Sequence, residues 1–242
     1  MTSPIITVTL NPAIDLTVTL DDLTPGKVHR ARAAQSNVGG KGINVAGCIA
    51  DWGIPVVATG VLGRGNDATF TDFFKDKGIQ DRFVRTAGDT RTNIKIADVV
   101  TGTTTDINLP GLTFDDETYD MVLDVLRREV VEGALVVLAG SLPLGQPASV
   151  WARLTADLCL LRCRVVLDTS GAPLAASLAA PRESLPFAVK PNRLELVSWA
   201  GRPLTDVADI VAAAGVVPAL GIAPVVVSRG EQGALFLRGN TA

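Results

Sequence analysis

Short, continuously apolar segments recur along the chain and are separated by segments with helical periodicity. The apolar runs occupy residues 135–139, 165–167, 187–189 and 225–227. Strands that are apolar on both faces are typical of a parallel sheet that is covered by helices on each side. Because strands and helices alternate, the pattern predicts an α/β fold with a mostly parallel, doubly wound central sheet.

The clearest helical pattern between these runs extends from Asp115 to Glu132. Thr113 is its predicted N-cap, because a threonine hydroxyl can accept a hydrogen bond from an N–H group of the first helical turn. Acidic residues fill that turn and arginines occur near the other end, as the helix dipole favours. The apolar face that we expect to pack on the sheet consists of Tyr119, Val122, Leu123, Leu126 and Val130.

Residues 15–36 and 91–109 carry a different pattern, in which apolar positions alternate with threonines and other polar residues. Such alternation predicts strands with one solvated face. We expect these segments to form a small β-sheet lid that projects from the main layer, where it would cover a site or pair with a second subunit. The pattern therefore favours a homodimer assembled through the lid, with residues 1–242 forming one α/β domain.

Composition narrows the range of partners. The chain is 47% hydrophobic and 19% charged, which is ordinary for a globular protein with a full core. A net charge of −3 without a long basic run argues against nucleic-acid binding and favours small-molecule partners. Three cysteines without neighbouring histidines suggest neither a disulfide framework nor a zinc site. With no secretory signal at residues 1–4, we expect a cytoplasmic protein.

The stretch from Ile210 to Ser228 contains no charged residue and allows two interpretations. One is a membrane-spanning helix of about 20 residues. The other is the end of a helix, a loop and a buried strand, which fits better because turn-forming residues interrupt the stretch. We therefore expect no membrane partner. The interrupting residues are Gly215, Pro218, Gly221 and Pro224.

Residues 39–46, with the sequence GGKGINVA, precede a helical pattern and suggest anion-binding chemistry. Glycines allow backbone N–H groups to approach a ligand, Lys41 adds a charge, and a helix that begins near Gly42 would direct its positive dipole end to the same place. The alternative is an ordinary tight turn at the start of a helix. The spacing matches neither Walker A nor GxGxxG, so a dinucleotide-binding dehydrogenase is disfavoured.

Polar residues stand where the predicted strands end. In open parallel sheets, ligands bind beyond the carboxyl ends of the strands. Any one of these residues alone is more often a turn former or a helix cap. Together with the glycine-rich segment they predict one site, formed around Asn11, Gly140, Ser141, Asp168, Lys190 and Ser228.

Eight strings in fixed order give the chain a family resemblance. It resembles the PfkB-type carbohydrate kinases of the ribokinase superfamily and, within them, the bacterial 1-phosphofructokinases. The strings are TLNPAID (9–15), GGKGINVA (39–46), GVLGRGN (60–66), TRTNIKI (90–96), AGSLPLG (139–145), LDTSG (167–171), VKPNRLEL (189–196) and VVVSRGEQGAL (225–235).

The resemblance implies a ribokinase-like fold and ATP-dependent, magnesium-assisted phosphorylation of a ketohexose phosphate. The implied reaction converts D-fructose 1-phosphate into fructose 1,6-bisphosphate. Tagatose 6-phosphate kinase and 6-phosphofructokinase activities remain open as alternatives, because their motifs overlap these strings. Catalysis in such a kinase consists of positioning and charge neutralisation.

On the substrate side, the resemblance implies that the Asp15 carboxylate accepts hydrogen bonds from sugar hydroxyls. It implies that Lys27 and Arg91 hold the sugar phosphate, and arginine offers the bidentate fork that phosphate prefers. Without such a role, Asp15 would be part of a turn before a strand. Lys27 and Arg91 would then belong to the solvated surface of the lid. The full implied set is Asp15, Lys27, Gly39, Gly40, Lys41, Asn44, Arg91 and Ser141, with Lys41 also a charge-stabilising candidate.

On the nucleotide side, the resemblance implies that Asn192 and Glu195 organise water around Mg²⁺, which usually keeps several waters in protein sites. The alternative is a helix cap with a first-turn acid, and both interpretations can hold together. The full implied set for ATP is Asp168, Lys190, Asn192, Glu195, Ser228, Gly230 and Gly233.

The general base is the missing part. Family members carry it as the aspartate of a GAGD motif, and no such string occurs in these 242 residues, whose only histidine is His29. We therefore expect the chain to represent part of a longer kinase, inactive or nearly so by itself. The alternative from another class is a non-catalytic relic that binds a sugar phosphate or a nucleotide.

Overall fold

The computed structural model describes residues 4–238, and within them a central sheet of nine strands forms the body of the molecule. The strands follow the order β13-β12-β11-β10-β9-β1-β4-β5, and β6 pairs with β4. All pairs are parallel except β12 with β13, which confirms the predicted mostly parallel sheet. The strands are β1 (Ile5–Thr9), β4 (Val56–Gly63), β5 (Gln80–Asp81), β6 (Val84–Thr86), β9 (Leu135–Ala139), β10 (Arg164–Asp168), β11 (Ala188–Val189), β12 (Val225–Ser228) and β13 (Ala234–Leu237).

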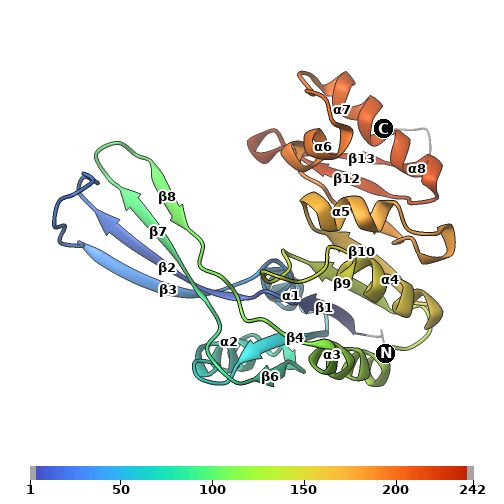
Figure 1. Cartoon of the computed structure of the whole chain (residues 1–242), viewed down its shortest axis with the longest axis horizontal. Coiled ribbons are helices and arrows are strands. Elements are labelled where there is room, and N and C mark those ends of the chain that lie inside the picture. The colour runs from blue at the N-terminus through green and yellow to red at the C-terminus, as the bar shows by residue number, and fades with distance from the viewer. Residues whose placement is uncertain (1–3, 239–242) are drawn as a thin grey trace.

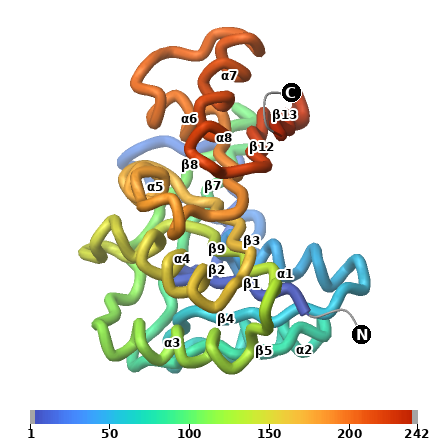
Figure 2. Tube along the Cα trace, turned by 90° about the vertical axis from the view of Figure 1, so that its right-hand side faces the viewer, coloured from blue at the N-terminus to red at the C-terminus, as the bar shows by residue number. Residues whose placement is uncertain are grey.

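Helices cover both faces of this sheet. Figure 2 shows α1 and α2 on one side of β1 and β4, and α3, α4 and α5 on the other. Within β4, Ala58 and Leu62 belong to the hydrophobic cluster of α1 and α2, whereas Val57 and Val61 belong to the cluster of α3 and α4. The helices are α1 (Lys41–Asp51), α2 (Ala68–Lys77), α3 (Asp116–Glu129), α4 (Val150–Leu160), α5 (Gly171–Leu178), α6 (Arg193–Ala200), α7 (Val207–Ala214) and α8 (Val216–Leu220).

A second sheet of four strands projects away from the body (Figure 1). It has the order β3-β2-β7-β8, with β2 antiparallel to β3 and parallel to β7. This sheet is the lid that the alternating segments predicted, although β2 and β3 extend slightly beyond residues 15–36. The strands are β2 (Ala13–Leu20), β3 (Ala33–Gly39), β7 (Thr92–Asp98) and β8 (Thr104–Ile107).

The predicted start and end of the helix at residues 115–132 were wrong. Asp115, rather than Thr113, is the N-cap of α3, and its carboxylate accepts hydrogen bonds from the N–H and the hydroxyl of Thr118, each at 2.9 Å. The helix ends at Glu129 because Val130 adopts an extended conformation. Thr113 and Asp115 both have side chains that can cap a helix, so the sequence alone did not distinguish between them.

The uncharged stretch after Ile210 forms the end of α7 and the strand β12, as the second interpretation predicted, but the short helix α8 occupies much of the expected loop. In the part of the chain that the structure describes, no helix is long and apolar enough to cross a membrane. The cysteines Cys48, Cys159 and Cys163 are free.

Candidate active site

The glycines of residues 39–42 allow close packing of backbone against neighbouring groups. A side chain at Gly42 would collide with Thr9 of β1, and one at Gly39 would collide with the carboxylate of Asp15. Gly40 adopts a φ of 124°, which side-chain-bearing residues rarely adopt. The packing and the φ of Gly40 support the tight-turn interpretation, and a role of this segment in anion binding stays a prediction. The same packing places the start of α1, with no side-chain cap, at the carboxyl edge of the sheet.

Lys41, the first residue of α1, reaches across this edge to two carboxylates. Its Nζ lies 2.9 Å from Asp168 Oδ1 and 3.3 Å from Glu195 Oε1. Lys190 Nζ lies 3.0 Å from the other oxygen, Asp168 Oδ2. The structure thus brings together Lys41, from the predicted sugar side, and three residues from the predicted nucleotide side.

These contacts set the protonation state of Lys41. Burial alone would lower its pKa, but hydrogen bonds and charge interactions with Asp168 and then Glu195 outweigh burial and raise the pKa above the ordinary value of 10.5. Lys41 is therefore a fixed positive charge at neutral pH.

Asn192 and Glu195 form a reciprocal cap at the start of α6. Asn192 Oδ1 accepts from the Glu195 N–H at 2.8 Å, and Glu195 Oε2 accepts from the Asn192 N–H at 2.8 Å. This confirms the helix-cap interpretation, and it leaves Glu195 Oε1 directed to Lys41. Ser228, at the end of β12, forms a backbone bridge with Asn192, so these residues are neighbours.

Gly230 and Gly233 lie in the turn between β12 and β13. Their φ angles are 61° and 79°, and the Arg229 N–H donates to the Gly233 carbonyl at 2.8 Å. The turn itself therefore requires glycine at these positions, whether or not the segment contacts a nucleotide.

On the sugar side, Asp15 lies on β2 next to Asn93 of β7. Asn93 Nδ2 donates to Asp15 Oδ1 at 3.0 Å, and Gly39 leaves room for the carboxylate on the β3 side. Asn93 is a residue that sequence reasoning missed. Its place in the string TRTNIKI, two positions after Arg91, was the available signal.

Arg91, at the base of the lid, is held by three backbone carbonyls. Nε donates to Pro12 O at 3.3 Å, Nη2 to Asn11 O at 3.3 Å, and Nη1 to Leu109 O at 3.1 Å. No ion pair within 4.0 Å involves Arg91 in residues 4–238, although the charge of Asp15 acts on it. Burial lowers the pKa of Arg91, an effect that Asp15 opposes. Two of the five guanidinium N–H groups remain free for an anion.

A cavity of about 470 Å³ adjoins Arg91. The predicted ligand Ser141 also lines it, together with Asn11, which sequence reasoning noted as a strand-end residue without giving it a role. The remaining lining residues come mainly from the segment that connects β8 to α3. They are Asn108, Leu109, Pro110, Gly111, Leu142 and Leu144.

The structure does not bring Lys27 to this cavity within one chain. Arg91 directly precedes β7, which is parallel to β2, so Arg91 lies at the base of the lid. Lys27 lies in the turn beyond the other end of β2, whose eight residues span about 26 Å. Asn44 does lie near the site, on the first turn of α1, and its N–H donates to the Gly40 carbonyl at 2.9 Å.

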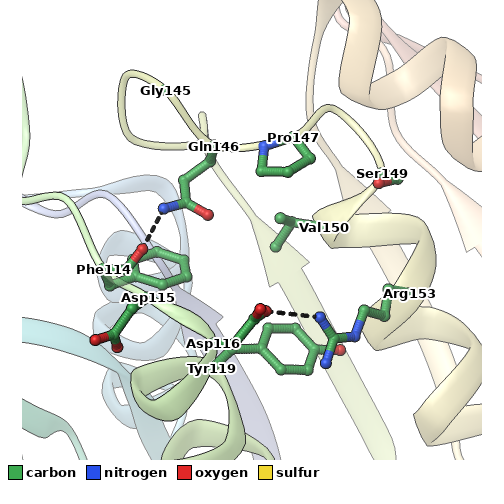
Figure 3. Close-up of a pocket in the computed structure, with 10 residues that line it drawn as sticks. All are labelled: Phe114, Asp115, Asp116, Tyr119, Gly145, Gln146, Pro147, Ser149, Val150 and Arg153. Carbon is green, nitrogen blue, oxygen red and sulfur yellow. Dashed lines mark hydrogen bonds and ion pairs between the residues drawn. The ribbon is translucent and has the colours of Figure 1, made fainter.

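Another cavity, of about 370 Å³, lies between the starts of α3 and α4 (Figure 3). Its charged side chains all have partners within α3 and α4. Arg153 donates to Asp116 at 3.1 Å and stacks 3.9 Å from the centre of the Tyr119 ring, and Gln146 donates to the Phe114 carbonyl. None of the predicted site residues lines this cavity, so we do not assign the reaction to it.

Comparison with known proteins identifies the family. Residues 8–242 match the sequence model of pfkB family carbohydrate kinases. The chain belongs to the PfkB family of carbohydrate kinases. The family assignment makes it a phosphotransferase and confirms the resemblance that the eight strings indicated.

Named relatives of this PfkB-family protein include bacterial 1-phosphofructokinases. The protein from Xanthomonas campestris pv. campestris is 53% identical over 233 residues, which span 96% of this chain and 73% of that relative. The protein from Rhodobacter capsulatus is 41% identical over 243 residues, spanning all of this chain and 76% of the relative.

Solved structures confirm the ribokinase-like fold of this PfkB-family chain. Phosphofructokinase-2 from Escherichia coli in complex with fructose-6-phosphate is 28% identical and superposes with a TM-score of 0.88, covering 98% of this chain and 77% of that structure. Ribokinase from Arabidopsis thaliana, at 22% identity and a TM-score of 0.70, shares the fold.

Proposed function

We propose that this protein transfers the γ-phosphoryl group of ATP to D-fructose 1-phosphate and forms fructose 1,6-bisphosphate. The free hydroxymethyl oxygen of the sugar would form a bond to the γ-phosphorus while the bond to the β–γ bridging oxygen breaks, so that ADP leaves. The identity of up to 53% with proteins named 1-phosphofructokinase supports this substrate. The observation that carries the proposal is Arg91, which forms no ion pair with residues 4–238 and lies within the electrostatic influence of the Asp15 carboxylate.

The sugar phosphate has a chemically suitable place at the base of the lid. Arg91 offers a positive charge with two free N–H groups, and the adjoining cavity also exposes Ser141. Asp15 and Asn93 offer oxygen acceptors, and Asn93 offers an amide donor, for the hydroxyls of a polyol. A phosphate at Arg91 would leave the sugar ring between that arginine and the Asp15 carboxylate.

The donor set on the nucleotide side suits Mg²⁺. Asp168 and Glu195 supply hard carboxylate oxygens, and the ammonium of Lys41 between them indicates that a positive charge is favoured there. Residues 4–238 contain no cluster of three or more potential metal-ligating side chains, so water and ATP oxygens would complete the coordination. When bound, Mg²⁺ supplies charge neutralisation on the ATP phosphates. Lys41 and Lys190 would hold the same phosphates in place.

The proton of the attacking hydroxyl needs an acceptor. The resemblance assigns this role to a GAGD aspartate, and no GAGD string occurs in the sequence. His29 is not a substitute, because its Nε2 contacts Thr24 within the far turn of the lid. We propose that the sugar-side and nucleotide-side residues described above bind and orient both substrates. The 242-residue chain alone would turn over little, because a missing general base lowers the rate about 10²–10⁴-fold.

We also propose that the protein forms a homodimer through the lid. Lys27 lies too far from Arg91 to act on the same phosphate within one chain, so it would reach a site only in a second copy. ATP and the sugar phosphate are the small-molecule partners of this proposal, which includes no nucleic-acid partner.

Coupled measurement of ADP release tests the function. Fructose 1-phosphate, fructose 6-phosphate and tagatose 6-phosphate are compared on the 242-residue chain and on a chimera that adds the C-terminal part of the Xanthomonas campestris relative. Activity of the chimera that is highest with fructose 1-phosphate supports the proposal. Preference for another sugar phosphate overturns the substrate, and turnover by the short chain overturns the assignment of the base.

A further inference from the structure

Asn11 connects the two groups that face the proposed phosphate cavity. Its backbone carbonyl accepts from Arg91 Nη2 at 3.3 Å. Its side-chain Nδ2 donates to Ser141 Oγ at 3.1 Å and to the Leu142 carbonyl at 3.1 Å. One residue thus contacts both Arg91 and Ser141, although Ser141 is 130 residues away in the sequence.

The contact with Leu142 determines which way the Asn11 amide faces. A backbone carbonyl only accepts hydrogen bonds, so the amide nitrogen must face Leu142 and, with it, Ser141. In the opposite orientation, the amide oxygen would face the carbonyl oxygen and both hydrogen bonds would be lost. Asn11 is 9% exposed and packs against Gly111, where a side chain would collide with Asn11 Oδ1. This packing restricts the amide to the observed orientation.

The orientation of the Asn11 amide determines what the Ser141 hydroxyl can do. A hydroxyl has one hydrogen to donate and two lone pairs to accept with. Because Asn11 Nδ2 occupies a lone pair of Ser141 Oγ, the hydroxyl hydrogen must be directed elsewhere. Ser141 Oγ forms no other hydrogen bond with residues 4–238. Ser141 is exposed and lines the cavity beside Arg91, where a ligand oxygen could accept this hydrogen.

We propose that Asn11 is a positioning residue that turns the Ser141 hydroxyl into a donor for the sugar phosphate and aligns it with Arg91. A phosphate accepts hydrogen bonds at all its oxygens, so a hydroxyl that donates beside a guanidinium group suits a phosphate better than an ammonium group, which cannot accept. This inference rests on the proposed function and deepens it, because it names the groups that recognise the phosphate.

Asn11→Asp tests the inference most directly, because the two side chains are nearly isosteric. Aspartate would accept a hydrogen bond from Ser141, whereas Asn11 donates one. A carboxylate would accept the Ser141 hydroxyl hydrogen and withdraw it from the cavity, and it would add a negative charge near the phosphate. We expect fructose 1-phosphate and inorganic phosphate to bind about 10- to 100-fold more weakly, as for the loss of a charge-assisted hydrogen bond. Asn11→Ala leaves the hydroxyl free to rotate toward the ligand, so a loss of only about threefold is expected.

Two double-mutant cycles test the coupling between Asn11 and Ser141. They need three further variants, which are Ser141→Ala, Asn11→Asp/Ser141→Ala and Asn11→Ala/Ser141→Ala. Isothermal titration calorimetry measures each affinity on the 242-residue chain, with ADP as the matched control ligand and thermal unfolding as the control for folding. If Asn11 acts through Ser141, the effect of Asn11→Ala disappears once Ser141 is alanine, and the effect of Asn11→Asp falls to the part caused by its added charge. A purely structural role of Asn11 would weaken phosphate and ADP binding alike.

The binding measurements distinguish a role of Asn11 that acts through Ser141 from an independent role. Coupling between Asn11 and Ser141 that is confined to phosphate-containing ligands supports the inference. Multiplicative, independent losses, or an unchanged affinity of Asn11→Asp, overturn it while the proposed function stands. If Asn11→Asp does not fold, the cycle with Asn11→Ala decides in the same way. If the wild-type chain binds ADP but neither phosphate nor fructose 1-phosphate, the proposed function fails and the inference fails with it.

Discussion

Lys41 Nζ lies 2.9 Å from Asp168 Oδ1, and this contact joins the two halves of the proposed site. Lys41 follows the glycine segment that packs against Asp15, whereas Asp168 ends β10 beside the start of α6. The same Nζ contacts Glu195, so the ammonium group lies between two nearly buried carboxylates. A divalent cation would be attracted to this position for the same electrostatic reason.

We expect Lys41→Met to bind Mn²⁺ more tightly than the wild type in the absence of nucleotide. Removing a competing unit charge from between two carboxylates should strengthen cation binding about tenfold or more. Electron paramagnetic resonance of free Mn²⁺ measures this affinity without any turnover. Lys190→Met is the matched control, because Lys190 forms an ion pair with one carboxylate, Asp168, among residues 4–238 and should have a smaller effect. Equal Mn²⁺ affinity of Lys41→Met and wild type would contradict this picture.

The raised pKa of Lys41 predicts a stability difference that depends on pH. The charged form is stabilised in the folded state, so the contribution of Lys41 is fully present below the unfolded-state pKa, which is near 10.5. The contribution is lost as the pH rises through the higher folded-state pKa. The difference in free energy of unfolding between wild type and Lys41→Met should therefore be constant from about pH 7 to 9 and shrink above 10.5.

Urea denaturation of the two proteins across this range provides the measurement. The difference between them cancels the titration of other lysines and tyrosines that both proteins share. A difference that grows above pH 10.5 would mean that Lys41 is not held in its charged form by the two carboxylates.

Arg91→Ala should weaken the binding of fructose 1-phosphate by about 1.5–3 kcal/mol, because a charge-assisted hydrogen bond to phosphate is lost. Arg91→Lys keeps the charge, but a single ammonium cannot bind three carbonyls and a phosphate in the same geometry. We expect it to recover only part of the affinity. Calorimetry with fructose 1-phosphate and with ADP separates the two halves of the site. Unchanged binding of the sugar phosphate would remove Arg91 from the site.

The sequence predicted the layers of the fold because the burial of a strand determines which of its consecutive residues are apolar. Strands such as β9 are apolar on both faces, and the lid strands alternate, so each was visible in a few consecutive residues. Helix ends were less certain. Thr113 and Asp115 both have capping side chains, and only the path of the chain decides which of them meets the Thr118 N–H.

The sequence pointed to most of the residues that the structure brings together at the sheet edge and the base of the lid, but not to their interactions. Arg91 was expected at the phosphate, yet the carbonyls that orient it belong to segments up to 80 residues away. Asn93 lay inside the TRTNIKI string and Asn11 at a strand end, but neither position indicated a role, because an asparagine next to a turn is often only a turn former. The sequence also did not reveal that packing against Thr9 and Asp15 requires glycine at residues 42 and 39, and the ligand-binding role of the segment stays a prediction.

Gly42→Ala should therefore destabilise the protein by about 1–3 kcal/mol, despite the higher helix propensity of alanine. The added methyl group would lie 2.8 Å from the Val8 carbonyl oxygen, which the sheet holds in place. Gly47→Ala in the same helix is the control, because its nearest neighbour is the movable ring of Phe73 at 3.2 Å. Urea denaturation should show little loss for Gly47→Ala. Equal stability of both variants would mean that α1 can shift away from β1.

The lid sheet presents an apolar face that, among residues 4–238, belongs to neither hydrophobic cluster of the body. Leu16 and Val18 of β2 lie opposite Ile94 and Ile96 of β7 on this face, and Ile107 of β8 is 44% exposed beside them. A contiguous apolar patch of this kind is typical of a contact between proteins, and the homodimer proposal assigns it to a second copy.

Val18→Glu places a charge in the centre of that face and should convert the dimer to a monomer in sedimentation velocity experiments. Burying an unpaired carboxylate against another apolar sheet is strongly unfavourable. Thr17→Glu is the matched control, because Thr17 points to the opposite face, next to Lys95, with which the new carboxylate can pair. Dimers of both variants would exclude this face as the interface. A monomeric wild type would overturn the dimer itself, and with it any role of Lys27 in a neighbouring site.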